Sequence, residues 1–336
     1  MTTDVAQTQQ AAQTAQSMLT AGPKLRARRG AGKQREKKAP QSFKLFLYVV
    51  PFFVLVFLFS YFPLWGWIYS FFDYKPALGL GHSEFVGLQW FRFLVDSPTQ
   101  LKQIGQVMIN TFAMSFLGIA SSVLPVAFAL FLNEIKSTWF KSIVQTLTTL
   151  PNFISWVLVY SIAFALFSTT GLVNSTLHDW GFIATPVQFL QSDSHVWLTM
   201  LAWNVWKTVG WGSILYLAAI AGIDPTLYES AKIDGAGRFQ LMRHITLPAL
   251  APTFFVLLML SIASILSNGL DQYYVFQNAF NQQHIQVLDL YVFNVGIVGN
   301  SLSMATAISM LKSVVSVVLL LGVNFLSKRV RGTSII

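Results

Sequence analysis

Long apolar stretches separated by short polar connections dominate the chain from residue 45 onward. A helix that crosses a hydrocarbon core about 30 Å thick needs roughly 20 apolar residues. Six stretches are long enough, at 45–72, 106–133, 142–168, 196–222, 248–270 and 304–327. None alternates like a membrane β-strand, and lipid offers no partner to an open strand edge. The pattern predicts an all-α, polytopic membrane protein with six transmembrane helices in one domain, residues 45–336.

Composition agrees with a membrane protein. Apolar residues make up 54% of the chain and charged residues only 10%, far below the charge content of a typical soluble domain. The absence of cysteine excludes disulfide bonds, thiolate metal sites and a cysteine nucleophile. The net charge of +9 does not indicate a nucleic-acid partner, because the chain has too little solvated surface for a basic groove.

The first 44 residues differ from the rest of the chain. They are polar and rich in Gln, Thr and Ala, and they end in a basic run between Lys24 and Lys44. With so few apolar residues they are predicted to form a disordered basic cytoplasmic tail. The apolar segment that follows is too long for a signal peptide, so we expect it to be retained.

Lysine and arginine predict which side of the membrane each connection faces. The connections on one side hold only Lys75, Arg92 and Lys102, and Lys207 and Lys312 fall within spans. All other basic residues lie in the tail, in the connections of the opposite side or after the last span. By the positive-inside rule, both termini and the loop 223–247 are predicted to be cytoplasmic.

The loop 223–247 is charged, unlike the segments on either side of it. Asp224 is a plausible N-cap and Pro225 a plausible first helical residue, so a helix of about ten residues should run to Asp234 and end at Gly235. A second short helix should start near Arg238 and lead into the fifth span. On physical grounds alone, the loop could equally be a solvated connector.

A resemblance to a known family favours a functional role for this loop over that of a connector. Glu229-Ser230-Ala231, Gly235 and the later Ile245-Thr246-Leu247-Pro248 resemble the "EAA" signature of binding-protein-dependent ABC importer permeases, with Ser230 in place of the usual second alanine. The stretches "YFPLWGWIYSFFDYKP", "FVGLQWF", "ALFLNEIKSTWFKSIVQTLTTLPNFISW" and "KSVVSVVLLLGVNFLSKR" resemble the sugar branch of these permeases, and within it the oligosaccharide and polysaccharide (aldouronate-type) group. The resemblance covers about residues 42–336.

The resemblance implies a type I ABC importer permease fold in a bacterial cytoplasmic (inner) membrane. It implies three protein partners: a second homologous permease, a cytoplasmic ABC ATPase dimer, and an extracellular or periplasmic solute-binding protein. The chain itself would be no enzyme and would bind no cofactor, because ATP and Mg would sit on the ATPase. The loop would form a coupling helix on the ATPase, with the residues Leu227, Tyr228, Glu229, Ser230, Ala231, Asp234, Gly235, Ile245, Leu247 and Pro248.

Polar and aromatic side chains within the apolar segments are candidates for a sugar path. Aromatic faces cover the apolar side of a sugar ring, and amides and carboxylates bind its hydroxyl groups. The candidates are Asn152, Trp156, Tyr160, Trp203, Asn204, Lys207, Asn268, Asp271, Gln272 and Tyr273. For the aromatic residues the alternative is an ordinary place at the membrane interface. For Lys207 and Lys312 it is a structural bond to a neighbouring helix.

Two other classes of function are weaker alternatives. The chain has no HExxH or GxSxG motif, no paired acids within a span, and histidines scattered at loops and ends, which argues against an enzyme or a metal site. A secondary transporter of small polar solutes is the stronger alternative. It would call for internal repeats and ion-coupling carboxylates within spans, whereas the acids of the outer side fall in connections or at span ends.

Overall fold

The computed structural model describes residues 41–331, which belong to two compact units that meet in the sequence between Ser60 and Tyr61. The tail predicted at 1–44 lies outside the described residues except for 41–44. The described part of the first unit is the helix α2 (Gln41–Val56), followed by a π-helical turn, η1 (Phe57–Tyr61). Its side chains from Phe46 to Ser60 are exposed except at Val50, as expected of a helix that faces lipid.

The second unit begins with one 3₁₀ helix and a small β-ribbon. The 3₁₀ helix is η2 (Phe62–Phe71), and the ribbon pairs β1 (Phe72–Asp73) antiparallel with β2 (Glu84–Phe85) around the short turn η3 (Leu80–His82). The first half of the unit then contains α3 (Gln89–Asp96), α4 (Pro98–Ser121), α5 (Val123–Glu134), α6 (Thr138–Thr149), η4 (Leu150–Phe153), α7 (Trp156–Phe167), α8 (Leu172–Asp179) and α9 (Val196–Ala221).

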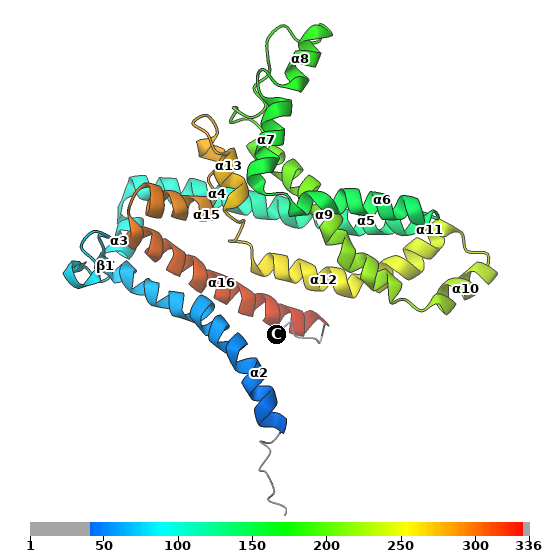
Figure 1. Ribbon diagram of the computed structural model, residues 1–336, viewed down its shortest axis with the longest axis horizontal. Coiled ribbons are helices and arrows are strands. Elements are labelled where there is room, and N and C mark those ends of the chain that lie inside the picture. Colours follow the sequence, from blue (N-terminus) through cyan, green and yellow to red (C-terminus); the bar gives the residue numbers. More distant parts are fainter. Residues whose placement is uncertain (1–40, 332–336) are drawn as a thin grey trace, which may run out of the picture. The chain divides into compact units, whose positions relative to one another are not determined.

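The second half of the unit is also helical. It contains α10 (Pro225–Ile233), α11 (Arg238–Leu241), η5 (Met242–Thr246), α12 (Leu247–Ala263), α13 (Asp271–Phe276), α14 (Gln282–Ile285), α15 (Leu288–Phe293), η6 (Asn294–Val298) and α16 (Leu302–Arg331). The predicted all-α class is confirmed, with the four-residue ribbon as a minor addition. Figure 1 shows α7 and α8 projecting from the other helices of this unit.

Five helices of the described region are long and apolar enough to cross a membrane: Phe46–Phe71, Pro98–Glu134, Trp156–Asp179, Arg238–Ala263 and Leu302–Arg329. The helix predicted at 196–222 is present as α9, with 26 residues, but it is not among these five, and Asn204 and Lys207 interrupt its apolar sequence. Its length of about 39 Å still exceeds a bilayer core of about 30 Å. The count of six spans therefore stays a prediction.

Two predicted segments were wrong in their limits. The segment 142–168 is not one helix, because α6 ends at Thr149 and α7 starts at Trp156 after the turn η4. Pro151 explains this break, since proline lacks the N–H that a helix needs and its ring clashes with the preceding turn. The segment 248–270 also ends early, because α12 stops at Ala263 and an irregular stretch, 264–270, leads into α13.

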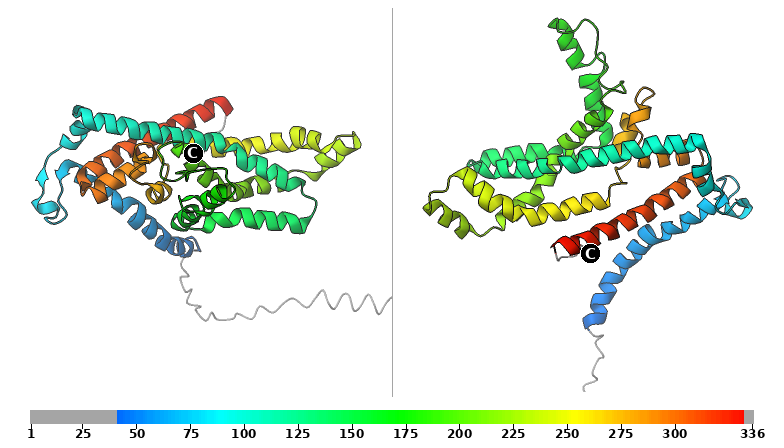
Figure 2. Two further views of the ribbon diagram at one scale, coloured as in Figure 1. Left: turned by 90° about the horizontal axis from the view of Figure 1, so that it is seen from above. Right: turned by 180° about the vertical axis from the view of Figure 1, so that it is seen from behind.

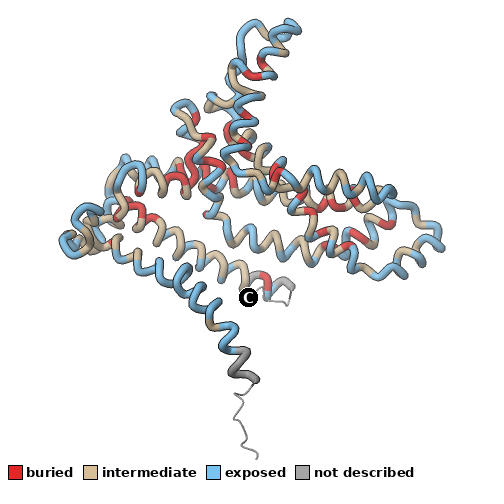
Figure 3. The backbone as a smooth tube through the Cα atoms, in the orientation of Figure 1, coloured by how far each residue is buried: buried red, intermediate tan, exposed pale blue. Residues whose placement is uncertain are grey.

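Helix α9 holds the second unit together. It contacts α4, α5, α6 and α12, and it contributes to two of the clusters of buried apolar residues. At Gly210 it approaches α6 so closely that a Cβ atom would lie 2.2 Å from the carbonyl oxygen of Thr148. Figure 3 shows buried positions concentrated where α7, α9 and α13 meet, and exposed positions along the outer faces of the long helices.

The long span Pro98–Glu134 separates the two ends of the second unit. Its 37 residues make a rod about 55 Å long, which exceeds a hydrocarbon core of about 30 Å. The turn after α5 lies beside α10 and α11 at one end, and α3 and the β-ribbon lie at the other, as both views show (Figures 1 and 2). The two ends therefore lie farther apart than a hydrocarbon core is thick.

Candidate functional site

The loop between α9 and α12 folds as two short helices. The Asp224 carboxylate caps α10 by accepting a 2.9 Å hydrogen bond from the backbone N–H of Thr226, which holds the pKa of Asp224 below its usual value. At the other end, the N–H of Ala236 bonds the carbonyl of Ala231 and the N–H of Gly235 bonds that of Lys232, the Schellman pattern. Gly235 has φ +82°, so the predicted helix and its glycine stop are confirmed.

Helix α10 presents an outward face and an inward face. Tyr228 points inward, and its hydroxyl lies 2.9 Å from the hydroxyl of Thr246 at the end of η5. Ala231 is half-buried, as Tyr228 is. The exposed face carries Leu227, Glu229, Ser230 and Ile233.

Two exposed apolar residues of this loop escaped the sequence analysis. Ile233 is 86% exposed and Phe239 is 67% exposed, although both lie in a charged segment. Ile233 lies seven residues, about two turns, after the exposed Thr226, so helical spacing applied from Thr226 could have placed it on the exposed side of α10. The other predicted coupling residues are placed as follows: Asp234 at the C-cap of α10, Ile245 half-buried in η5, and Leu247 and Pro248 exposed at the start of α12.

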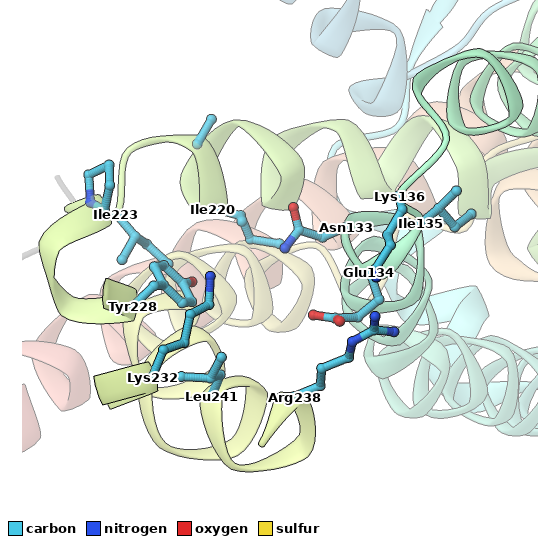
Figure 4. Close-up of a pocket in the computed structure, with 12 residues that line it drawn as sticks. Asn133, Glu134, Ile135, Lys136, Ile220, Ile223, Tyr228, Lys232, Arg238 and Leu241 are labelled. Atoms are coloured by element: carbon cyan, nitrogen blue, oxygen red, sulfur yellow. The ribbon is translucent and has the colours of Figure 1, made fainter. Parts of the chain in front are cut away.

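A cavity of about 490 Å³, which we call the loop cavity, lies behind α10 (Figure 4). Its wall includes the turn after α5, the end of α9 and α11. Glu134 and Arg238 extend toward each other across it, and Lys136 and Lys232 add positive charge. α10 is therefore backed by charged side chains and held to η5 by Tyr228.

A second cavity, the polar cavity, lies inside the bundle and measures about 220 Å³. It is lined by α4, α9, α12 and the irregular stretch 264–270. Ser115, near the middle of the long span Pro98–Glu134, forms its floor: the Ser115 hydroxyl donates to the carbonyl of Ile265 and accepts a 2.8 Å bond from the Asn268 amide. Non-helical backbone at membrane depth is tolerated where it lines a water-filled cavity.

Three sequence-predicted residues meet in the polar cavity. Asn204 comes from α9, Asn268 from the irregular stretch and Tyr273 from α13. Gln272 lies next to them, with its amide nitrogen 2.7 Å from the carbonyl of Met200 and its oxygen 3.4 Å from the Asn204 amide. The serines of the wall were missed, because isolated serines in apolar helices carry little signal in sequence: Ser115, Ser261, Ser264 and Ser267.

The side-chain oxygen of Asn268 is the unsatisfied group of this cavity. It is buried and accepts no hydrogen bond from any described residue. A buried acceptor without a donor costs about 1–3 kcal/mol, so the position favours a ligand or water that donates a hydrogen bond.

The other predicted path residues lie elsewhere. Trp203 lines a separate aromatic cavity of about 320 Å³ with Trp206, Phe167 and Phe189. Tyr160 packs its ring against Phe276. The remaining residues are Asp271, exposed in the first turn of α13, and Asn152 and Trp156 at the break between α6 and α7.

Lys207 has a structural role. The residue is 7% exposed, and its ammonium group donates to three backbone carbonyls at the α6–α7 break, those of Pro151, Asn152 and Ile154, over 2.5–3.0 Å. These bonds use all three of its N–H groups. The ring of Trp156 lies 5.4 Å from the same nitrogen. The lysine thus satisfies carbonyls that the broken helix leaves open, and the structural alternative fits its geometry better than a place in the sugar path.

Lys312 also forms a structural bond, in this case an ion pair. Its ammonium group in α16 pairs with the Asp289 carboxylate at the start of α15, and the second oxygen of that carboxylate accepts a 3.0 Å bond from the N–H of Gly269. Gly269 has φ +83° and directly follows Asn268. The ion pair therefore fixes the irregular stretch that lines the polar cavity.

We expect Lys312→Met to destabilise the protein strongly, because it leaves the Asp289 carboxylate without its cation. Losing one partner of a buried pair costs about 3–5 kcal/mol, and this partly exposed pair should fall near the lower end. The melting temperature in detergent measures the loss. The double variant Lys312→Met/Asp289→Asn should recover much of it, and a double variant no more stable than Lys312→Met would contradict the pairing.

Comparison with known proteins identifies the chain. Residues 121–332 match the family described as the binding-protein-dependent transport system inner membrane component. The chain belongs to this family. The matched range includes α10, α11 and most of the wall of the polar cavity, and the permease is therefore a multi-pass membrane subunit of an ABC importer.

Individual relatives agree over most of the permease. Protein LplB of Bacillus subtilis strain 168 is 37% identical over 85% of this chain and 88% of its own length. The polygalacturonan/rhamnogalacturonan transport system permease protein YteP of the same strain is also 37% identical, over 85% and 88%. A crystal structure of a bacterial alginate ABC transporter in complex with an alginate pentasaccharide-bound periplasmic protein matches with TM-score 0.76 and 31% identity, over 87% of this chain and 96% of that one.

Proposed function

We propose that the permease carries an oligosaccharide or polysaccharide fragment into the cytoplasm through the polar cavity, driven by ATP hydrolysis in partner subunits. The observation that carries the proposal is the position of this cavity. It lies near the middle of the spans, is lined by serines and asparagines, and contains an unpaired amide oxygen on Asn268. Sugar hydroxyls both donate and accept hydrogen bonds, as this lining requires.

The relatives support a sugar as the substrate class. YteP is named for polygalacturonan and rhamnogalacturonan, and the solved structure holds a periplasmic protein loaded with an alginate pentasaccharide. A chain that resembles both over most of its length is expected to handle a sugar polymer fragment. The sugar itself would be chosen by the lining of this permease and by its partners.

The proposal includes partners and an orientation. An extracellular or periplasmic binding protein would deliver the sugar, a second permease would complete the pathway, and a cytoplasmic ABC ATPase dimer would bind ATP and Mg. The permease would catalyse no reaction itself. The end with α10 would be cytoplasmic, because its connections carry most of the lysines and arginines outside the spans.

Coupling would pass through α10. Its exposed face, with Leu227, Glu229 and Ile233, would sit in the ATPase. Tyr228 links this helix to η5, and η5 continues into α12, whose far end leads into the wall of the polar cavity. A displacement of α10 would thus reach the cavity along a short, rigid route, the kind of rigid-element motion that alternates access in transporters.

Replacing Asn268 with leucine tests the proposed path. Asn268→Leu keeps a similar volume but removes the unpaired oxygen, so sugar uptake by the reconstituted transporter should fall at least about 10-fold, the effect of one lost hydrogen bond of about 1.4 kcal/mol. Uptake of labelled oligosaccharide into proteoliposomes that contain the ATPase, the second permease and the loaded binding protein measures the change.

Serine variants provide the matched comparison. Ser115→Ala removes a hydroxyl from the cavity, whereas Ser175→Ala removes one from the exposed surface of α8. Uptake should fall in the first and not in the second. Normal uptake in both Asn268→Leu and Ser115→Ala, with the complex intact, would place the path outside this cavity.

A further inference from the structure

Another cavity, which we call the glutamine cavity, opens at the end of the second unit that is opposite α10. It measures about 500 Å³ and lies between the first turns of α4, the residues before α9 and the segment around α14. This volume is within the range of small-molecule sites, about 300–1,000 Å³. Residue 103 lies 12 positions before Ser115 on α4, so the cavity is about 18 Å along the helix from the polar cavity.

Side-chain amides dominate the wall of this cavity. Five glutamines line it, and the amide of Gln106 bonds Asn110 at 3.2 Å. The other four form no side-chain hydrogen bond to any described residue: Gln103, Gln282, Gln283 and Gln286. Each free amide offers both donors and an acceptor. The wall can therefore bind a ligand with several groups, each of which both donates and accepts hydrogen bonds.

Asp193 contributes a buried acceptor to the same cavity. One of its oxygens lies 2.6 Å from Nδ1 of His284, and the other is buried and accepts no hydrogen bond from any described residue. A buried polar atom without a partner is uncommon and is costly to leave so. If the carboxylate turns toward the cavity, a ligand that donates a hydroxyl hydrogen would satisfy it.

The segment around α14 is held rigidly against α4 and α9. The Asn110 amide donates to the carbonyls of Gln283 and Gln286, and the indole N–H of Trp197 donates to the carbonyl of His284 at 3.0 Å. Figure 1 shows α15, which follows this segment, beside the first half of α4. The free amides are thus carried on a fixed backbone, as a preformed site requires.

The chemistry of the lining selects among ligands. Among the described residues, no lysine or arginine lines the cavity, and the Asp193 carboxylate would repel an anion such as a uronate. A metal ion is a poor fit, because the described residues contain no cluster of three or more His, Cys, Asp or Glu side chains. Phe280, 65% exposed on the wall, offers an aromatic face for the apolar side of a sugar ring.

We propose that the glutamine cavity is an outer-face subsite for an uncharged sugar unit. It rests on the proposed function, because the end opposite α10 is the outer one only if α10 faces the cytoplasm. The subsite holds one end of the oligosaccharide before the sugar reaches the polar cavity. It favours neutral units over acidic ones at this position.

Binding to the assembled transporter tests the subsite. The complex in nanodiscs, without its binding protein, is titrated with xylotetraose and with tetragalacturonate, and saturation-transfer NMR measures each affinity. Xylotetraose should bind at least about 10-fold more weakly to the double variant Gln103→Ala/Gln283→Ala, whose two side chains are exposed and should not affect folding. Gln89→Ala, an exposed glutamine on α3, is the matched control and should bind as the wild type does.

Asp193→Asn tests the selection by charge. It keeps an acceptor at the same place but removes the charge, so the variant should bind tetragalacturonate at least about 5-fold more tightly than the wild type. Unchanged xylotetraose affinity in the double variant, or unchanged tetragalacturonate affinity in Asp193→Asn, overturns the subsite.

The uptake assay separates the two proposals: if the wild-type complex imports the sugar while the double variant binds it normally, only the subsite is wrong. If the wild-type complex imports no sugar, the proposed function fails and the subsite fails with it.

Discussion

Gly210→Ala should prevent the permease from folding into a stable bundle. The new Cβ would lie 2.2 Å from the carbonyl oxygen of Thr148, and real Cβ atoms do not approach backbone atoms so closely. Overpacking a core costs about 1–3 kcal/mol even where side chains can move aside. Here the obstacle is the backbone of α6, so α6 and α9 must separate and the bonds from Lys207 to the α6–α7 break are strained as well.

The yield of folded protein and its melting temperature in detergent measure this effect. Gly322→Ala is the matched control, because Gly322 also lies inside a long helix but has no heavy atom within 4 Å of its would-be Cβ. That variant should be unchanged or up to about 1 kcal/mol more stable, since alanine favours a helix. Equal stability of the two variants would mean that α6 and α9 do not touch at Gly210.

Gly235→Val should uncouple ATP hydrolysis from transport. Gly235 stops α10 with φ +82°, a conformation that a β-branched residue adopts only with strain of about 1–3 kcal/mol. Apart from Gly235 and its two chain neighbours, no heavy atom of the described residues lies within 4 Å of the added Cβ, so the strain acts on the backbone turn alone. The turn would relax by shifting α10, and the exposed face with Leu227 and Ile233 would no longer match its seat on the ATPase.

Two measurements follow the uncoupling: the amount of ATPase that co-purifies with the permease, and sugar-stimulated hydrolysis. Gly181→Val provides the same strain in another place, because Gly181 has φ +74° and equally open surroundings in the turn after α8. It should lower stability by a similar amount without releasing the ATPase. If Gly235→Val keeps normal coupling, the loop 223–247 is only a connector.

The loop 223–247 shows what sequence predicts well. Its caps are local: Asp224, Pro225 and Gly235 each act within one helical turn, so their residue types alone predict where α10 begins and ends. The faces of α10 were harder to predict, because they depend on contacts from elsewhere. The bond from Tyr228 to Thr246 turns Ala231 partly inward and leaves Ile233 exposed.

The polar cavity shows the opposite case. Asn204 and Asn268 are 64 positions apart, and hydropathy treats each as an isolated polar residue in an apolar helix. The irregular stretch after Ala263 brings them together, whereas the apolar pattern predicts a helix that continues to residue 270. The role of Lys207 is hard to predict for the same reason. Its partners are backbone carbonyls, which are available to a lysine only where the helix is broken.

Both lysines that lie within the long helices find their partners earlier in the chain. Lys207 binds carbonyls at residues 151–154, and Lys312 pairs with Asp289. A lone lysine entering the bilayer costs about 2.5–3.5 kcal/mol on insertion scales. Because the ribosome makes the N-terminal part first, the partner of each lysine has already been synthesised when the lysine emerges. The order of synthesis thus favours insertion of α9, which carries Lys207, just after the α6–α7 break has formed.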